Sequence, residues 1–308
     1  MEYDYICSSR AELTGRIGSV ISESVEKLSD MSAFEKRITP VSNGPLPSVE
    51  AVRDMLSLVK TVTFPEFHDI YHGTRAMEQA RLSVSVERLF RSLSKEIGHA
   101  LYQKNPKLGS SHAADKGIEL ALKIIGCLPK IKKLLYTDVQ AIYDNDPATE
   151  DFGEVILSYP VVHAMVHYRF AHELLKAGVP VLPRIITELA HSDTGIDINP
   201  GATIGEYFAI DHGTGVVIGE TCIIGNHVTL YQGVTLGARN FTLNGEGHPI
   251  SLPRHPILED HVTVYANATI LGRITVGHDT IVGGNVWLTE SVPPNSKVVQ
   301  KNADFLVR

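Results

Sequence analysis

The sequence predicts an α+β protein, in which an N-terminal all-helical domain precedes a C-terminal left-handed parallel β-helix with one protruding loop. Two observations predict this division. Up to about residue 190, aliphatic residues recur at the three- and four-residue steps of an amphipathic helix. After residue 195 they recur every six residues instead, which is the repeat of a parallel β-helix. We therefore place the helical domain at 1–194, with 1–50 as a candidate N-terminal arm, the β-helix at 195–294 and a tail at 295–308.

Three amphipathic runs predict the helical domain. The first spans Leu82 to Leu101. The second, around Ile118 to Ile125, is expected to end or kink at Pro129, because proline lacks an amide hydrogen and clashes with the preceding turn. The third runs from about Val155 to Lys176 and stops before the glycine and proline of AGVP, the usual order of helix-ending residues. Ahead of these runs, the segment SNGPLPSVE around residue 45 has the composition of a loop.

The six-residue period is the strongest signal in the sequence. Each hexad forms one flat side of a triangular coil, whose narrow interior the aliphatic residue fills. With one two-residue slip after Val216, the aliphatic series is Ile198, Ile204, Ile210, Val216, Ile218, Ile224, Leu230, Leu236, Leu258, Val264, Ile270, Val276, Val282 and Leu288. Small or β-branched residues expected to point inward follow four places later, at Ala202, Thr214, Cys222, Val228, Val234, Val262, Ala268, Thr280 and Val286. Ordinary β-strands alternate their inward and outward residues with a period of two, which does not predict aliphatic residues that stay in phase over many six-residue steps.

The coil is interrupted once. Leu236 to Leu258 holds one hexad and sixteen further residues, which predicts a protruding loop over 238–256. Long loops on rigid scaffolds are more often functional than accidental. The flat outer faces of so short a solenoid are commonly covered by symmetric association, which predicts a trimer.

Composition excludes several classes of function. The 28 Lys plus Arg and 35 Asp plus Glu residues give a net charge of −7, which argues against general affinity for nucleic acid or anionic membranes. No stretch reaches the roughly 18 apolar residues of a membrane span, and the start MEYDYICSSR lacks the apolar run of a signal peptide. Cys7, Cys127 and Cys222 form no disulfide or metal pattern, which favours a reducing cytoplasm. We expect a cytoplasmic protein with neither nucleic acid nor membrane as a partner.

Histidines in the third helical run suggest a metal site at first sight. His163 and His167 share a predicted helix face, with His172 close behind. A zinc site of this kind also requires an acidic partner on that face, as in H-E-x-x-H, and none follows His163. The favoured alternative is packing or capping on an amphipathic helix, so no metal is expected.

A candidate general base lies at the slip of register. Asp211 and His212 directly precede Gly213 and Gly215, and Asp197 lies fifteen residues earlier. Because three hexads close one turn, this spacing brings Asp197 toward His212. A carboxylate that orients an imidazole makes a general base. The alternative, two surface charges that cap corners of the coil, stays open.

A second candidate pair, Arg254-His255, closes the protruding loop. The planar guanidinium of arginine suits a carboxylate or a phosphate. A solvated loop end is the open alternative.

Together these segments resemble the serine O-acetyltransferase family. The family's elements occur in order as Asp146-Pro147-Ala148, GIDINPGATIG, DHGTGVVIGET, YQGVTLGA and PRHP, between roughly Tyr136 and Pro294. The resemblance implies an acyltransferase that moves the acetyl group of its co-substrate acetyl-CoA to the hydroxyl of L-serine. The product, O-acetylserine, is used for cysteine biosynthesis.

The resemblance also implies roles for individual residues. His212 would be the general base and Asp197 would hold its imidazole, while His255 is a candidate second acid/base. The remaining contacts fall into three groups: Asp146 and Asp211 at the serine ammonium; Arg254 and His255 at its carboxylate; and Thr235, Gly237, Ala266 and Ala268 along acetyl-CoA. In the family these sites are shared between neighbouring subunits of a trimer, and helical domains often join two trimers.

The sequence departs from the family pattern at several positions. Asn199 replaces the usual histidine of D-I-H-P, and Ala238 stands where a second glycine commonly follows T-L-G. After Pro294 the usual G-V-P-A segment is missing, which leaves the distal coenzyme A contacts undefined. The chain ends in Arg308 and not in the isoleucine by which family members dock into the cysteine-making sulfhydrylase. This ending argues against that complex.

Three other functions compete with serine acetylation. The first is the same chemistry on homoserine or a sugar, but Asp146 with Arg254 and His255 suits an amino acid zwitterion. The second is a γ-type carbonic anhydrase-like zinc protein, whose histidine spacing His227, His255 and His261 do not reproduce. The third is a scaffold without activity, against which the intact Asp197 and His212 argue.

Overall fold

The computed structural model describes residues 2–40, 44–68, 73–240, 243–247, 250 and 252–300. The chain forms two compact units, Met1–Asn43 and Gly44–Arg308. The first unit contains α1 (Glu2–Ser29) and α2 (Ala33–Ile38). A capping box starts α2, in which Ser32 and Glu35 each accept a backbone N–H of the other. None of the described helices combines the length and apolarity needed to cross a membrane.

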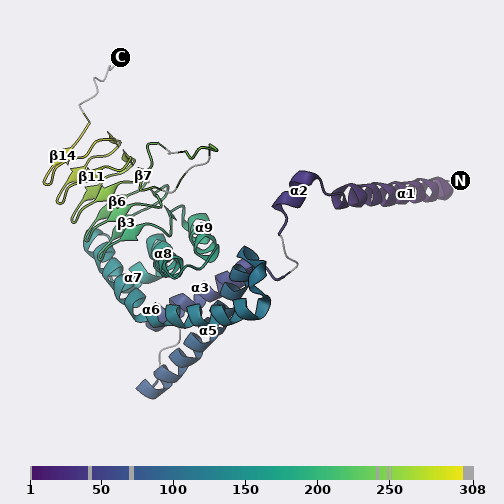
Figure 1. Ribbon diagram of the computed structural model, residues 1–308, viewed down its shortest axis with the longest axis horizontal. Helices are drawn as coiled ribbons and strands as arrows, with labels where there is room; N and C mark the ends of the chain where they lie inside the picture. Colours follow the sequence, from purple (N-terminus) through teal and green to yellow (C-terminus); the bar gives the residue numbers. More distant parts are fainter. Residues whose placement is uncertain are drawn as a thin grey trace, which may run out of the picture. The chain divides into compact units, whose positions relative to one another are not determined.

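The second unit begins with a layer of helices (Figure 1). Its helices are α3 (Val49–Thr63), α4 (Pro65–His68), α5 (Arg75–Lys104), the 3₁₀ helix η1 (Pro106–Leu108), α6 (Ser110–Asn145), α7 (Phe152–Ser158), α8 (Pro160–Lys176) and α9 (Leu182–Thr194).

The structure differs from the prediction at two points in these helices. Pro129 does not end the second run but lies inside α6, where buried Ile124, Leu128 and Ile131 pack on both sides of it. Burial of this apolar face outweighs the loss of one backbone hydrogen bond. The third run is two helices, because Pro160 disfavours the helical conformation at the residue before it. That residue, Tyr159, is extended, with φ −79° and ψ 122°, and separates α7 from α8.

The helices are followed by a parallel β-helix, as predicted. Its strands are β1 (Asp197–Ile198), β2 (Thr203–Ile204), β3 (Ala209–Asp211), β4 (Val217–Ile218), β5 (Ile223–Ile224), β6 (Thr229–Tyr231), β7 (Thr235–Gly237), β8 (Ile257–Leu258), β9 (Thr263–Val264), β10 (Thr269–Leu271), β11 (Thr275–Val276), β12 (Ile281–Val282), β13 (Trp287–Leu288) and β14 (Lys297–Val298). The three faces of the coil are the parallel sheets β1-β4-β7-β10-β13, β2-β5-β8-β11 and β3-β6-β9-β12-β14. We name them the first, second and third face.

The interior of the coil confirms the six-residue period. Every aliphatic residue of the series is buried, with an exposed fraction of at most 9%. Among the small residues expected inside, Thr214 is the exception and is exposed. Asp197 on β1 pairs with Val217 twenty residues later, whereas Val217 pairs with Thr235 after eighteen. The first coil therefore holds two extra residues, and Thr214 is pushed out at the corner that follows β3.

The protruding segment and the end of the chain complete the second unit. Residues 238–256 connect β7 to β8, and 241–242, 248–249 and 251 among them lie outside the described residues. The last strand, β14, falls within the segment predicted as a tail. Residues 301–308, on which the prediction about the sulfhydrylase complex depends, also lie outside the described residues.

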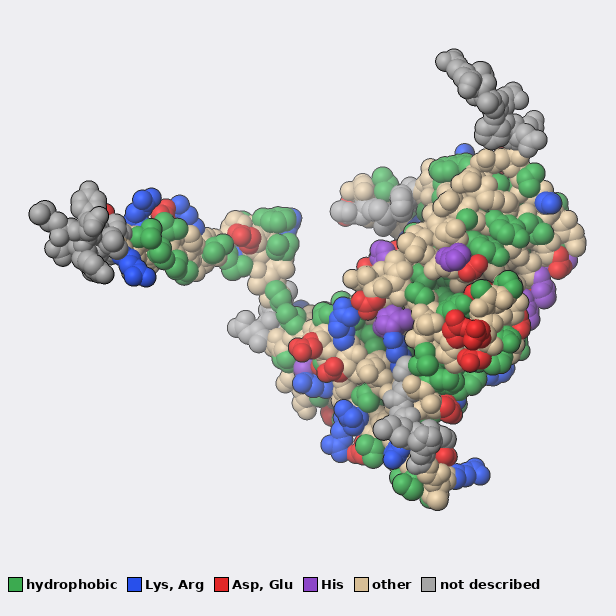
Figure 2. Space-filling model, turned by 180° about the vertical axis from the view of Figure 1, so that it is seen from behind, with side chains coloured by type: hydrophobic (Ala, Val, Ile, Leu, Met, Phe, Trp, Pro, Cys, Tyr) green, Lys and Arg blue, Asp and Glu red, His purple; other side chains and the backbone are tan. Residues whose placement is uncertain are grey.

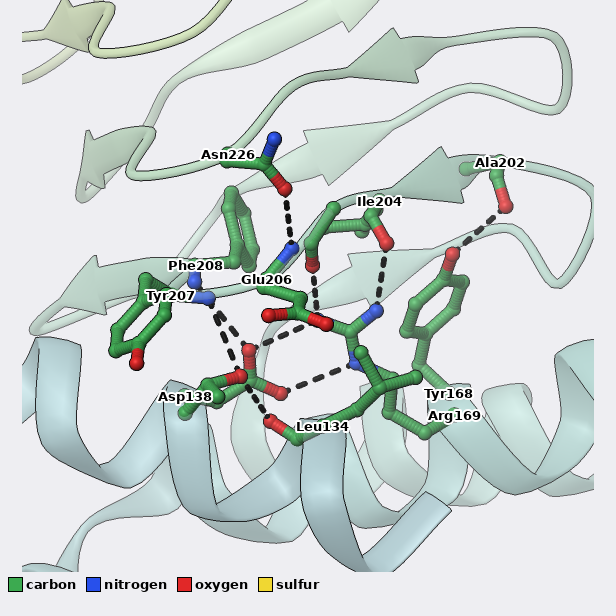
Figure 3. A network of polar contacts seen from close by, with 12 residues as sticks. Leu134, Asp138, Tyr168, Arg169, Ala202, Ile204, Glu206, Tyr207, Phe208 and Asn226 are labelled. Atoms are coloured by element: carbon green, nitrogen blue, oxygen red, sulfur yellow. Dashed lines mark hydrogen bonds and ion pairs between the residues drawn. The ribbon is translucent and has the colours of Figure 1, made fainter. Parts of the chain in front are cut away.

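A buried ion pair attaches the helices to the first coil (Figure 3). Arg169 on α8 donates to both carboxylate oxygens of Asp138 on α6, at 2.8 and 3.1 Å. It also donates to the carbonyls of Ile204 and Gly205, both at 2.6 Å. The backbone N–H of Phe208 donates to Asp138 at 3.3 Å. These bonds fix the C-terminal part of α6 against the chain that leads into β3.

Candidate active site

Asp146 caps the C-terminal end of α6. Pro147 follows it and keeps it out of the helical region, so Asp146 is extended with φ −114° and ψ 101°. Its Oδ1 accepts the backbone N–H of Ala148 at 2.8 Å, and its Oδ2 accepts the hydroxyl of Tyr159 at 2.6 Å. The hydrogen bond from Tyr159, followed by that from Ala148, lowers the pKa of Asp146. The carboxylate is therefore ionised and oriented.

His212 projects from the corner enlarged by the two extra residues. Its backbone has a φ of 57°, and Gly213 and Gly215 beside it have φ values of 88° and 79°, in the region that favours glycine. This geometry leaves 74% of the His212 side chain exposed, with Nε2 3.9 Å from Oδ1 of Asp211. The charge of His212 makes a further, small contribution that lowers the pKa of Asp146. We call Asp146, Asp211 and His212 the His212 cluster.

Tyr231 borders this cluster. It lies beside Asp211 in the register of β3 and β6 and stacks on Tyr265, with ring centroids 4.9 Å apart. Burial is the main cause that raises the pKa of the Tyr231 hydroxyl, and the charges of Tyr265, Asp211 and Asp146 raise it further. Tyr231 therefore stays protonated and presents a neutral group beside the two carboxylates.

Asp197 lies one strand away from this cluster. Its backbone N–H donates to the carbonyl of Val216 at 2.9 Å, in the segment that follows His212. Among the described residues, no hydrogen bond or ion pair joins Asp197 to His212, and the carboxylate nearest that imidazole is Asp211.

His255 is held in a fixed orientation at the end of the protruding loop. Its Nδ1 accepts the backbone N–H of Thr221 at 3.1 Å and lies 2.9 Å from the Thr221 hydroxyl. That hydroxyl oxygen accepts the backbone N–H groups of Arg254 and His255, so its own proton points to Nδ1. The neutral ring therefore carries its proton on Nε2. Burial, followed by the charge of Arg254, lowers the pKa of His255.

Arginines surround His255. Arg254 donates to Oε2 of Glu220 at 2.7 Å, and Arg273 donates to the carbonyl of His255 at 3.0 Å. Next to them lies a cavity of about 350 Å³, lined by Arg239, Arg254 and Arg273 among others. We call Glu220, Thr221, Arg254, His255 and Arg273 the His255 cluster. Sequence reasoning missed Thr221 and Arg273, although Thr221 lies within the DHGTGVVIGET segment.

The residues predicted to contact acetyl-CoA lie on the first face and at one of its corners. Thr235 and Gly237 belong to β7, and Ala266 and Ala268 lie at the corner after β9. Ala268 is fully buried, side chain and backbone alike. The backbone N–H of Thr235 donates to its carbonyl at 3.0 Å, and Gly272 donates to the carbonyl of Gly237 at 3.0 Å.

The His212 and His255 clusters occupy different corners of the coil. His212 lies where the third face turns into the first, between β3 and β4, and His255 lies where the first face turns into the second, directly before β8. The first face separates the two corners. A single copy of the chain therefore does not bring all the predicted site residues together.

Four other histidines have partners away from these two clusters. Nδ1 of His167 contacts the carbonyl of His163, and Nδ1 of His172 contacts that of Pro200. His227 and His261 stack at 4.8 Å on the corner between the second and third faces, away from His255. Figure 2 shows imidazoles beside acidic side chains on the surface of the larger unit. Within the part of the chain that the structure describes, no three or more His, Cys, Asp or Glu side chains are arranged to hold a metal ion.

Known proteins resemble the chain in sequence and in structure. A plasmid serine acetyltransferase of Synechococcus elongatus is 42% identical over 262 residues, which cover 83% of this chain and 82% of that protein. Serine acetyltransferase 1 of Entamoeba histolytica, solved in complex with L-cysteine, is 33% identical with a TM-score of 0.70, over 89% of this chain and 94% of that one. A serine acetyltransferase solved in complex with CoA is 26% identical with a TM-score of 0.51, over 80% and 95% of the two chains. No protein-family model matches the chain.

Proposed function

This chain belongs to the serine acetyltransferase family, and on that premise we propose that it transfers the acetyl group of acetyl-CoA to the hydroxyl of L-serine, with His212 as the general base. One observation carries the assignment of the base. The two extra residues of the first coil project His212 outward, with Nε2 3.9 Å from the carboxylate of Asp211. The product is O-acetylserine, which serves cysteine biosynthesis.

The reaction is a direct transfer. His212 takes the proton of the serine hydroxyl as the oxygen attacks the thioester carbon of acetyl-CoA. The tetrahedral intermediate collapses to the ester and expels the coenzyme A thiolate, which receives the proton from His212. Asp197 orients the imidazole once the side chain turns toward it. Holding both substrates in one site supplies the orientation that the uncatalysed reaction lacks.

Serine is bound by groups of both signs. Asp146 and Asp211 face its ammonium, and Arg254 and His255 bind its carboxylate. The bonds that hold the Asp146 carboxylate and the His255 ring in place support this arrangement. Arg254 shares its guanidinium between Glu220 and the substrate carboxylate. A neutral sugar offers neither charge, so an amino acid is the better acceptor.

The complete site needs two copies of the chain. Since the first face separates the two clusters, the His212 cluster of one copy meets the His255 cluster of a neighbour. A trimer provides three such contacts, and the helical layer can join two trimers. Acetyl-CoA lies along the same contact, against Thr235, Gly237, Ala266 and Ala268. The arginine-lined cavity beside His255 suits its phosphates.

A thiol-release assay tests the function. The purified chain with acetyl-CoA and L-serine is expected to release coenzyme A only when serine is present. L-homoserine and a hexose serve as alternative acceptors and are expected to support much slower release. A chain that releases no coenzyme A with serine, or that prefers either alternative, would contradict the proposal.

The cytoplasmic location stays a prediction from the sequence.

A further inference from the structure

The hydroxyl of Tyr159 is placed by a break between two helices. Pro160 starts α8 and keeps Tyr159 out of the helix, so its side chain leaves the helical layer at the junction with α7. There it meets the turn Asp146-Pro147-Ala148-Thr149, which is closed by a hydrogen bond from the N–H of Thr149 to the carbonyl of Asp146, 3.2 Å long. The two segments lie thirteen residues apart in sequence and are joined by the hydrogen bonds of the Tyr159 hydroxyl.

At this turn the chemistry of each group fixes which atom donates and which accepts each hydrogen bond. An ionised carboxylate only accepts, so the single proton of Tyr159 points to Oδ2 of Asp146, at 2.6 Å. The Thr149 hydroxyl, 2.9 Å from the Tyr159 oxygen, must then donate to it. Oδ1 of Asp146 accepts the N–H of Ala148. Both carboxylate oxygens of Asp146 thus accept hydrogen bonds, which fixes the orientation of the carboxylate plane.

We infer that Tyr159, supported by Thr149, is a positioning residue that holds the Asp146 carboxylate in the orientation that binds the ammonium of the acceptor amino acid. The inference rests on the proposed function, because it takes Asp146 as the ammonium contact. A carboxylate free to rotate would meet the ammonium in only part of its orientations. Tyr159 therefore affects acceptor binding and leaves acetyl-CoA binding unchanged.

The test is Tyr159→Phe in the full chain, which removes one oxygen atom and keeps the ring. The KM for serine is expected to rise on the order of tenfold, because the carboxylate that binds the ammonium loses the hydrogen bond that orients it. The KM for acetyl-CoA is expected to change by less than about twofold, because its contacts do not involve Asp146. Steady-state kinetics with each substrate varied in turn measures both.

Thr149 and Tyr136 supply the controls. Thr149→Val is expected to raise the serine KM in the same direction but by less, and Thr149→Ser, which keeps the hydroxyl, is expected to behave as the wild type. Tyr136→Phe removes a hydroxyl that bonds Glu66 at 3.4 Å, and is expected to leave both KM values unchanged.

The outcomes separate the inference from the function on which it rests. A wild-type chain without serine-dependent release contradicts the function itself. An active wild type with an unchanged serine KM in Tyr159→Phe overturns the inference, as does a rise in both KM values. Should the Tyr159 variant fail to fold, Thr149→Val decides, and an unchanged serine KM there overturns the inference.

Discussion

Replacing His212 with alanine is expected to lower the turnover number for serine acetylation by at least about a hundredfold, the usual contribution of a positioned general base. The side chain is 74% exposed and packs against little, so its removal leaves the fold unchanged. Turnover is measured at saturating serine and acetyl-CoA, with thermal unfolding as the check on folding. A variant with near-normal turnover would show that the base is another residue.

Asp197→Asn and Asp211→Asn distinguish the two carboxylates near this base. If Asp197 orients the imidazole, its replacement lowers the turnover number and changes the serine KM little. If Asp211 contacts the ammonium, its replacement raises the serine KM. The opposite pattern would exchange the two roles and agree with the 3.9 Å approach of Asp211 to His212.

Asp138→Ala is expected to lower the free energy of unfolding by about 3–5 kcal/mol, the effect of leaving one charge of a buried ion pair without its partner. Arg169 is 4% exposed and would lose two of its hydrogen bonds, although the carbonyls of Ile204 and Gly205 remain. Denaturant unfolding at a fixed protein concentration measures the change. A loss below about 1 kcal/mol would contradict this role for the pair.

Two further variants act as controls for Asp138→Ala. Replacing both Asp138 and Arg169 with apolar residues of similar volume is expected to recover much of the lost stability, because no unpaired charge is left. Glu87→Ala breaks the exposed pair of Glu87 with Arg91 and is expected to cost less than about 1 kcal/mol.

The β-helix could be predicted from sequence because its repeat is local and continuous. Each of the fourteen aliphatic positions, from Ile198 to Leu288, depends on the same requirement for a filled interior, and all are buried. The slip near Val216 also located the unusual corner. The slip did not reveal which residues leave the coil, and Thr214 was wrongly expected inside because the period alone does not show where an insertion is absorbed.

Contacts between segments that lie far apart in the chain could not be predicted from the sequence. The sequence pattern from Val155 to Lys176 does not single out Tyr159, whose special position arises because Pro160 starts a new helix. The hydrogen bond from Tyr159 to Asp146 depends on how α6 and α8 pack against each other. The ion pair of Asp138 and Arg169 joins residues on two helices for the same reason. The pairing of Arg254 with Glu220 crosses the protruding loop. Such contacts arise from tertiary packing, which local periodicity does not encode.

The central claim is that serine is acetylated at a site that two copies of the chain complete together. Its most direct test is to coexpress His212→Ala and His255→Ala chains with different tags and to isolate assemblies that carry both. Each variant alone is expected to be nearly inactive. A trimer that carries both variants restores both wild-type clusters at one of its three contacts, so it is expected to show about a third of wild-type activity. Mixed assemblies as inactive as the single variants, or a failure of the two chains to associate, would contradict the claim.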